Sequence, residues 1–333
     1  MTLHRRTFLG LSAAAAATAA TGFKFGPAAA QDATPAADPM TAYGPVQGNE
    51  PYKLAFMQVF PSNAFWQLLK EGVEARAAED GVTVDVIALP DEAGVADQVA
   101  QMEDAVTKGY DGIILGTIDA AGIVQGVEAA NAAGIPVIAV DTAPAGGELI
   151  SLVQTDNVAA STQQGEYVVE LIGGAGKVLN LQGDMANQTA QARNEGLHAA
   201  LDAHPDIQVI DQSAHWQQDE GFTITENILT SDPDIVAIVG ANDPPILGAL
   251  QALVAAGRDD VYLVGFDASP DVVQAIIDGS VDGTIAQYPK VMGTVGVDLM
   301  VRHLNGEEVP ALVDSGALLV TADNAAEFQA ANA

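Results

Sequence analysis

Along most of the chain, short runs of β-branched and other apolar residues alternate with longer stretches of helical periodicity. In one such stretch Val95, Val99, Met102 and Val106 fall on one helical face. Runs that are apolar without alternation, such as 112-GIILG-116, indicate strands covered by helices on both faces. The pattern predicts ten strands, at residues 53–59, 82–89, 112–116, 136–141, 150–155, 177–183, 207–212, 235–240, 261–267 and 283–287.

This order of elements predicts an α/β fold. Strands that alternate with helices form parallel sheets joined by right-handed crossovers. Ten strands divide into two sheets of five or six, and the second half, which begins near Lys177, repeats the order of the first. No long linker separates the halves, so we expect two doubly wound parallel-sheet lobes joined by short crossings, an arrangement typical of a hinge.

The first thirty residues differ from the rest and predict a secretory signal. Arg5 and Arg6 precede a short Ala-rich apolar stretch, and 28-AAA-30 follows as a cleavage site. The arginine pair resembles a twin-arginine export signal, and the stretch is too weakly apolar for a membrane span. Residues 31–50, rich in Ala, Pro, Asp and Gly, predict a disordered leader. We therefore expect an exported protein, periplasmic or otherwise extracytoplasmic.

Charge and cysteine content narrow the choice of partners. The formal net charge is −32, and removal of residues 1–30, with three cations and no acids, leaves 9 basic and 44 acidic residues, or −35. Such a field disfavours nucleic acid and anionic lipid surfaces. The chain has no cysteine, which excludes disulfides and a lipid-anchor Cys. We expect a soluble protein and a monomer.

Motifs of catalysis are missing from the sequence. It contains neither a Gly-x-Ser-x-Gly elbow nor a His-Glu-x-x-His pair, and its five histidines show no metal-ligand spacing. The segment 173-GGAGKV-178 precedes a predicted strand and lacks Ser or Thr after Lys177, so it reads as a helix-ending turn rather than a phosphate loop. We expect no enzyme activity, no cofactor and no metal.

Polar and aromatic side chains instead recur where predicted strands end. Two lobes whose strand ends face each other would bring these groups into one cleft. Carboxylates, amides and an arginine can pair with the hydroxyls of a sugar, and aromatic faces can cover its C–H surfaces. The candidate ligand-binding residues are Asn63, Phe65, Trp66, Asp141, Arg193, Trp216, Asn242, Asp267 and Gln287. The neighbouring Asp243 is expected to brace its turn.

Seven segments, in order, resemble the ribose-binding family of periplasmic binding proteins, the sugar receptors of ABC importers with the fold of LacI-type regulators. They are 61-PSNAFWQLLKEG-72, 136-PVIAVD-141, 154-QTDN-157, 191-QARNEGL-197, 240-GANDPPILGALQAL-253, 263-LVGFDASPD-271 and 284-TIAQYP-289. The resemblance implies that the nine candidate residues line a sugar site. The three aromatic rings would sandwich the sugar, and its hydroxyls would be bonded by Asp141, Arg193, Asn242, Asp267 and Gln287. An export signal stands where the regulators carry a DNA-binding headpiece.

The resemblance also implies how the chain divides. The expected N-terminal lobe comprises residues 51–154 and 288–315, and the C-terminal lobe residues 155–287 and 316–333. Crossings are expected near Thr155, Gln287 and Ser315, which form a three-stranded hinge. The lobes would close over a monosaccharide or sugar alcohol and present it to a membrane permease.

Two alternatives stay open at this stage. A sugar-sensing receptor for chemotaxis or a signalling kinase would share every feature, and a secreted carbohydrate-modifying enzyme would also have an acidic cleft. Specificity is open as well. Ribose-type members place Arg directly after the strand-end Asp, where this chain has Thr142. That difference puts ribose itself in doubt and admits another pentose, a hexose or an acyclic polyol.

Overall fold

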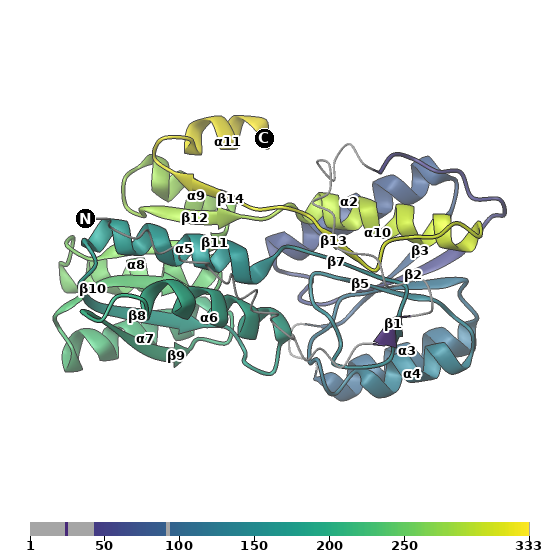
Figure 1. Cartoon of the computed structure of the whole chain (residues 1–333), viewed down its shortest axis with the longest axis horizontal. Helices are drawn as coiled ribbons and strands as arrows, with labels where there is room; N and C mark the ends of the chain where they lie inside the picture. Colours follow the sequence, from purple (N-terminus) through teal and green to yellow (C-terminus); the bar gives the residue numbers. More distant parts are fainter. Residues whose placement is uncertain (1–23, 26–42, 91–93, 333) are drawn as a thin grey trace, which may run out of the picture.

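A computed structural model describes residues 24–25, 43–90 and 94–332 of the chain. Two sheet-containing lobes lie side by side along the long axis of the molecule (Figure 1). The predicted signal peptide, except for residues 24 and 25, and residues 31–42 of the predicted leader lie outside the described residues.

The first lobe is built on a six-stranded sheet in which every pairing is parallel. Its strand order is β13 (Leu312–Asp314), β7 (Ser151–Gln154), β5 (Val137–Val140), β4 (Gly112–Leu115), β2 (Lys53–Gln58) and β3 (Thr83–Ala88). Its helices are α2 (Ala64–Asp80), α3 (Val95–Lys108), α4 (Val124–Ala132) and α10 (Pro289–Leu304).

The second lobe repeats this order, with an antiparallel strand at one edge. Its sheet runs β14 (Leu318–Thr321), β12 (Gly283–Ala286), β11 (Tyr262–Asp267), β10 (Ile235–Gly240), β8 (Gly176–Gln182) and β9 (Ile207–Ser213). Its helices are α5 (Asn157–Ile172), α6 (Gln188–Leu201), α7 (Gln218–Ser231), α8 (Asp243–Ala256), α9 (Pro270–Ile277) and α11 (Ala325–Ala331). Separately, β1 (Lys24–Phe25) pairs with β6 (Glu148–Leu149).

The predicted α/β fold with two parallel-sheet lobes is confirmed. All ten predicted strands are present, with ends within one residue of those expected. In each lobe the first strand lies between the second and the third, β2 between β3 and β4, and β8 between β9 and β10. The order in which successive strands are added to the sheet therefore reverses beside the first strand. Such a reversal is the topological switch point at which open α/β sheets form a ligand crevice.

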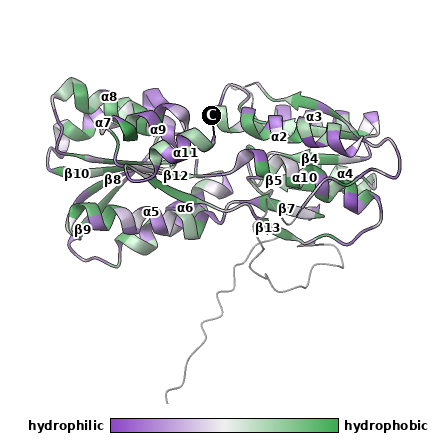
Figure 2. Ribbon diagram, turned by 90° about the horizontal axis from the view of Figure 1, so that it is seen from above, coloured by the Kyte–Doolittle hydropathy of each residue, from purple (hydrophilic) through white to green (hydrophobic). Residues whose placement is uncertain are grey.

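Helices cover both faces of each sheet, which explains why the strands are apolar without alternation. In the first lobe α2 and α10 pack together on one face and α3 and α4 on the other. In the second lobe α7 and α8 form one layer and α5 and α6 the opposite one (Figure 2). The strands between these layers are mostly green in Figure 2, the colour of hydrophobic residues.

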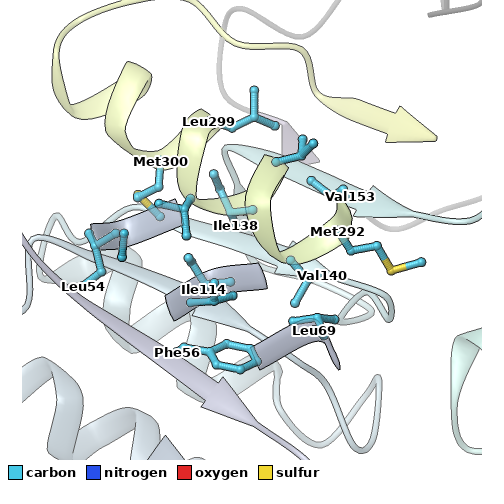
Figure 3. Close-up of a cluster of buried hydrophobic side chains, with 14 of the residues drawn as sticks. Leu54, Phe56, Leu69, Ile114, Ile138, Val140, Val153, Met292, Leu299 and Met300 are labelled. Atoms are coloured by element: carbon cyan, nitrogen blue, oxygen red, sulfur yellow. The ribbon is translucent and has the colours of Figure 1, made fainter. Parts of the chain in front are cut away.

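The core of the first lobe is completed by helix α10, which comes late in the chain and packs on a sheet whose strands come mostly from its first half. Helix α10, far along the chain, lies over strands β2, β4 and β5 (Figure 3). Gly293 allows α10 to approach α2 closely, since a Cβ there would lie 2.3 Å from the Leu69 carbonyl oxygen. The labelled side chains of this cluster are Leu54, Phe56, Leu69, Ile114, Ile138, Val140, Val153, Met292, Leu299 and Met300.

The chain passes between the lobes at three places. It changes lobe between β7 and α5, between β12 and α10, and between β13 and β14. Thr155, Gln287 and Ser315, the residues expected at the crossings, lie in these three connections. Two of the crossings, those after β7 and after β13, are bonded to each other, since the Ser315 amide donates to the Gln154 carbonyl and the Asp156 amide to the Asp314 carboxylate. Bending about these connections stays a prediction.

Residues 43–50 differ from the flexible leader expected there. The Val46 amide donates to Asp80 Oδ1 over 3.0 Å, and the Asn49 amide donates to Asn305 Oδ1 over 2.8 Å. Tyr43 and Val46 also pack against the core cluster of the first lobe. The segment is therefore held against the ends of α2 and α10 by contacts with residues distant in sequence.

Candidate functional site

One cavity of about 370 Å³ lies where strand ends of both lobes meet. Its walls come from the loops after β2, β4 and β5 in the first lobe and after β8 to β12 in the second. All nine residues singled out in the sequence line it: Asn63, Phe65, Trp66, Asp141, Arg193, Trp216, Asn242, Asp267 and Gln287. The structure therefore brings the whole candidate set together, and contact of each member with a ligand stays a prediction.

Arg193 is the centre of the polar wall and is fixed by protein groups. Its Nη1 donates to the Ala241 carbonyl oxygen over 2.6 Å and its Nε to Asn157 Oδ1 over 2.8 Å. The guanidinium carbon lies 3.7 Å from the centroid of the Phe266 ring, and Nη1 lies 3.6 Å from Asp267 Oδ1. A planar cation held on two edges and one face is preorganised to present its remaining donors in a fixed direction.

The carboxylates around Arg193 are buried, and this burial changes their acidity. Burial raises the pKa of Asp267 to about 6, although the Arg193 charge and the Gln287 hydrogen bond oppose the rise. Burial also raises the pKa of Asp141, against the effect of Arg193 and of the Thr142 hydroxyl. The wall thus carries two carboxylates to one guanidinium, and within the described ranges the guanidinium forms an ion pair with Asp267, over 3.6 Å, rather than with Asp141.

Asp243 lies behind this wall and confirms the expected bracing role. Its carboxylate accepts from the Ser269 amide over 2.6 Å and from Thr284 Oγ1 over 2.8 Å. It therefore ties the start of α8 to the loop after β11. Burial, and the nearby charge of Asp267, raise the pKa of Asp243 to about 8.

Two amides of the cavity have acceptor atoms to spare. Asn242 occupies the N-cap position of α8, yet its side chain makes no capping bond, and its Nδ2 donates to the Trp216 carbonyl oxygen over 3.4 Å. Gln287 Nε2 donates to Asp267 Oδ1 over 2.6 Å. Among the described residues, no partner is found for the buried Asn242 Oδ1 or Gln287 Oε1. A buried acceptor left unpaired costs about 1–3 kcal/mol, so both atoms indicate a ligand that donates.

Asn63 differs from these two amides because its side-chain oxygen already has a protein partner. Its Oδ1 accepts from the Phe65 amide over 2.8 Å and caps α2. Asn63 is therefore a helix cap, a common role for Asn before a helix, whereas the side chain of Asn242 is not. Asn63 lines the cavity as well, so its amide nitrogen and the second lone pair of Oδ1 are available to a ligand.

Aromatic rings from both lobes line the cavity. Phe65 and Trp66 lie in the first turn of α2 with ring centroids 5.6 Å apart in an edge-to-face arrangement, and both belong to the core of the first lobe. Trp216, from the second lobe, has the Arg193 guanidinium carbon 5.8 Å from its ring centroid. The first two rings therefore serve the core and the cavity at once.

The loops around the cavity are strained. Within the described ranges, six non-glycine residues have a positive φ, a conformation that costs of order 1–3 kcal/mol and that clusters at functional sites. All six follow strands at this edge of the sheets: Phe60, Asp141, His215, Trp216, Asp267 and Ala268. Four of them line the cavity, which supports its assignment as the functional site.

The sequence reasoning missed several lining residues or gave them no role in binding. These are Phe60, Ser62, Thr117, Thr142, Asn187, Thr189, Gln217, Gln218 and Pro244. Thr117 follows β4 directly, so the strand-end rule could have found it. Asn187 and Thr189 begin α6, and the Asn187 side chain accepts from the Thr189 amide, which is the ordinary reason for Asn at such a position.

Two threonines join the lobes beside the cavity. The hydroxyls of Thr142, after β5, and Thr189, in α6, lie 3.0 Å apart. Thr142 Oγ1 also donates to Asp141 Oδ2 over 2.7 Å, so its hydrogen is already engaged. Thr142 therefore supports Asp141 and does not supply the donor that an arginine would supply there.

Across residues 24–25, 43–90 and 94–332, no helix is long and apolar enough to span a membrane. In the same ranges no three His, Cys, Asp or Glu side chains gather as metal ligands would.

Comparison with known proteins identifies the family. The chain matches the periplasmic binding protein domain over residues 54–308. The ribose import binding protein RbsB of Escherichia coli K12 is 34% identical over 250 residues, 75% of this chain and 84% of that protein.

Solved structures agree. An ABC transporter solute-binding protein of Agrobacterium vitis with bound α-D-tagatopyranose has a TM-score of 0.80 at 26% identity, covering 84% of this chain and 98% of that one. One from Bacillus halodurans with bound myo-inositol has a TM-score of 0.78 at 27% identity, covering 85% and 99%. With its two switch-point lobes and a match over residues 54–308, the chain belongs to the periplasmic binding protein domain family.

Proposed function

We propose that the protein is the extracytoplasmic solute-binding component of an ABC importer, and that it binds a monosaccharide or sugar alcohol between its lobes. One observation carries the proposal: acids, amides, an arginine and aromatic rings from both lobes converge on a single cavity of about 370 Å³. That volume lies toward the small end of ligand pockets, as a single sugar requires.

The hydrogen-bonding capacity of the cavity fits a polyhydroxylated ligand. Its amides already use donors on protein groups, since Gln287 donates to Asp267 and Asn242 donates to Trp216. Acceptors remain on these amides and on the two carboxylates. Each hydroxyl of a sugar can donate to such an acceptor and accept from Arg193, while a carbohydrate C–H face can lie on an aromatic ring.

The relatives support the same class of ligand. The E. coli relative is named for ribose import, and the solved relatives hold tagatose and myo-inositol. Myo-inositol is a carbocycle without a ring oxygen. A ligand of that kind needs no arginine to donate to a ring oxygen, and this chain has Thr142 where ribose-type members carry the arginine. We therefore place ketoses, aldohexoses and cyclic or acyclic polyols ahead of ribose.

Closure of the two lobes would complete the site. Both lobes contribute polar groups, since Asn63 and Asp141 come from the first lobe and Arg193, Asn242 and Asp267 from the second. Only the closed arrangement can therefore satisfy a ligand on all sides, and ligand binding shifts the population toward it. The protein would reach its place by the predicted signal peptide, act as a monomer without enzyme activity, and hand the sugar to a membrane permease.

A thermal-shift screen tests this function. D-ribose, D-allose, D-tagatose, D-glucose, myo-inositol, glycerol and a few amino acids would be added separately, since a ligand that binds only the folded state raises Tm. At a concentration of 1,000 times Kd the gain is about 4 kcal/mol. We expect a rise with at least one sugar or polyol and none with the amino acids. The reverse result, or chemical conversion of any of these compounds by the protein, would contradict the proposal.

Binding should weaken in mild acid. Burial holds the pKa of Asp267 near 6, so this carboxyl becomes protonated as the pH falls through 6. Ligand hydroxyls donate best to the ionised form, so affinity should be full above pH 6 and decline below it. From pH 7.5 to pH 5.0 we expect Kd to rise about tenfold, by proton linkage. Asp141, whose pKa is raised too, would act in the same direction.

Isothermal titration calorimetry at several pH values measures this dependence. The control is His215→Gln, which removes the histidine beside Trp216, because histidine is the residue type that ordinarily changes charge in this range. The control should show the same dependence as the natural protein. A Kd that stays constant down to pH 5.0 would show that no ionised carboxylate of raised pKa receives the ligand.

A further inference from the structure

Each tryptophan of the chain is seated on a glycine at the end of a strand. Gly116 follows β4, and a Cβ there would lie 2.5 Å from Cη2 and 2.6 Å from Cζ3 of Trp66. Gly183 follows β8, and a Cβ there would lie 2.3 Å from Cη2 and Cζ2 of Trp216. Real Cβ atoms do not approach carbon so closely, so any other residue at either position would displace the ring.

Backbone geometry does not require these glycines. Both have a φ outside the left-handed region, so any L-residue could adopt their conformation. The closest contact at both places is the tryptophan ring, which is therefore the main reason that the structure offers for glycine; at Gly116 a Cβ would also lie 3.1 Å from the Met57 carbonyl oxygen. From the sequence alone, a glycine that makes room for a tryptophan ring cannot be told apart from a glycine in an ordinary turn after a strand.

The strand ends that carry the glycines are themselves fixed. The Gly116 amide donates to the Met57 carbonyl oxygen over 3.0 Å, and its own carbonyl accepts from Gln98 Nε2 over 2.6 Å. The Gly183 carbonyl accepts from Ser213 Oγ over 2.9 Å. A clash at either glycine would therefore be relieved by movement of the ring, and both rings border the open volume of the cavity.

We infer that Gly116 and Gly183 are specificity-determining positions, because they set how deeply the Trp66 and Trp216 rings are recessed and so how much room the cavity leaves for a ligand. The link to a ligand rests on the proposed function, whereas the seating of the rings does not. The two positions act from opposite lobes, one on each wall. A side chain at either would narrow the space for the sugar without altering any hydrogen-bonding group.

Tryptophan fluorescence tests the seating without a ligand, because the chain has only two tryptophans. Trp216→Phe leaves Trp66 as the only reporter, and Trp66→Phe leaves Trp216. Adding Gly116→Ala to the first or Gly183→Ala to the second should shift the emission to longer wavelength and increase quenching by acrylamide, since the ring moves toward the cavity. Gly44→Ala is the control, because its Cβ would have nothing within 4 Å. Unchanged emission and quenching would overturn the inference for that glycine.

Binding tests the consequence, with D-tagatose, D-allose and myo-inositol as probes. For any probe that the natural protein binds, Gly116→Ala should weaken affinity at least tenfold. The same change made in Trp66→Phe, whose shorter ring clears the added methyl group, should cause less than a threefold further loss. Equal losses in the two backgrounds would overturn the inference, since neighbouring residues that act through one contact are not additive.

Folding of the variants gives a separate outcome. Should Gly116→Ala fail to fold while Gly116→Ala/Trp66→Phe folds, the contact with the ring is confirmed. Should both fail, the glycine serves the backbone and the inference is wrong. If no sugar or polyol of the thermal-shift screen binds the natural protein, the proposed function fails, and the fluorescence result still decides how the rings are seated.

Discussion

Asp267→Asn is expected to weaken sugar binding on the order of 100-fold and to leave the Tm of the ligand-free protein nearly unchanged. A hydrogen bond to a charged group contributes about 1.5–3 kcal/mol, and a neutral amide also presents one oxygen fewer to the ligand. The fold should tolerate the change because the new side-chain oxygen can still accept from Gln287 Nε2, and Arg193 keeps its bonds to Ala241 and Asn157. Calorimetric titration with the best probe of the thermal-shift screen measures the loss.

Asp271→Asn is the matched control for this change. Asp271 lies four residues further along, in the first turn of α9, and its side chain is exposed. The same loss of charge there should leave affinity within about twofold, because an exposed charge is screened by solvent and salt. Unchanged binding by Asp267→Asn would remove Asp267 from the site, and equal losses in both variants would indicate an effect of net charge alone.

Arg193→Leu is expected to abolish binding and also to destabilise the fold. Removal of one partner from a buried ionic group costs about 3–5 kcal/mol, because the remaining charge is left uncompensated. Here Asp141 and Asp267 would face each other without a cation, and the Ala241 carbonyl and Asn157 would lose their donor. The loss should be smaller at pH 5 than at pH 7.5, because carboxyls with raised pKa can take up protons as the pH falls.

Urea denaturation at the two pH values measures this effect. Lys108→Gln is the control, since it breaks an ion pair with Asp104 in which both side chains are about half exposed, 52% and 57%. Such surface pairs contribute roughly 0–1 kcal/mol. An Arg193→Leu variant as stable as the control, or one that binds sugar normally, would contradict the central place given to Arg193.

Local pattern predicted most of the fold because most of its elements are defined locally. The ten strands are apolar runs bounded by turn residues, and glycines such as Gly81, Gly109 and Gly257 end helices in the left-handed conformation. The two-residue strands β1 and β6 were missed. So were β13 and β14, because each pairs with a strand far back in the chain and not with its neighbour in the sequence. Their existence depends on the assembled sheets and not on their own sequence.

The site was predictable to the extent that it follows from topology. Strand ends of a parallel sheet meet at one edge, so Asn242 and Asp267 could be placed together, and Asp141 at the same edge of the other lobe, before any coordinates. Residues with both a structural and a lining role could not be predicted as part of the site. Asn187 is an example, because it caps α6 and also lines the cavity. Contacts across the lobes, such as that between Thr142 and Thr189, depend on how the lobes face each other, which no local pattern encodes.

A crystal structure with the probe of highest affinity tests the central claim most directly. The account predicts one sugar or polyol molecule in the cavity between the lobes, with hydroxyls within hydrogen-bond distance of Asp267, Asn242 and Arg193 and with C–H faces against Trp66 and Trp216. Electron density for the ligand elsewhere on the molecule, with this cavity filled only by water, would contradict it.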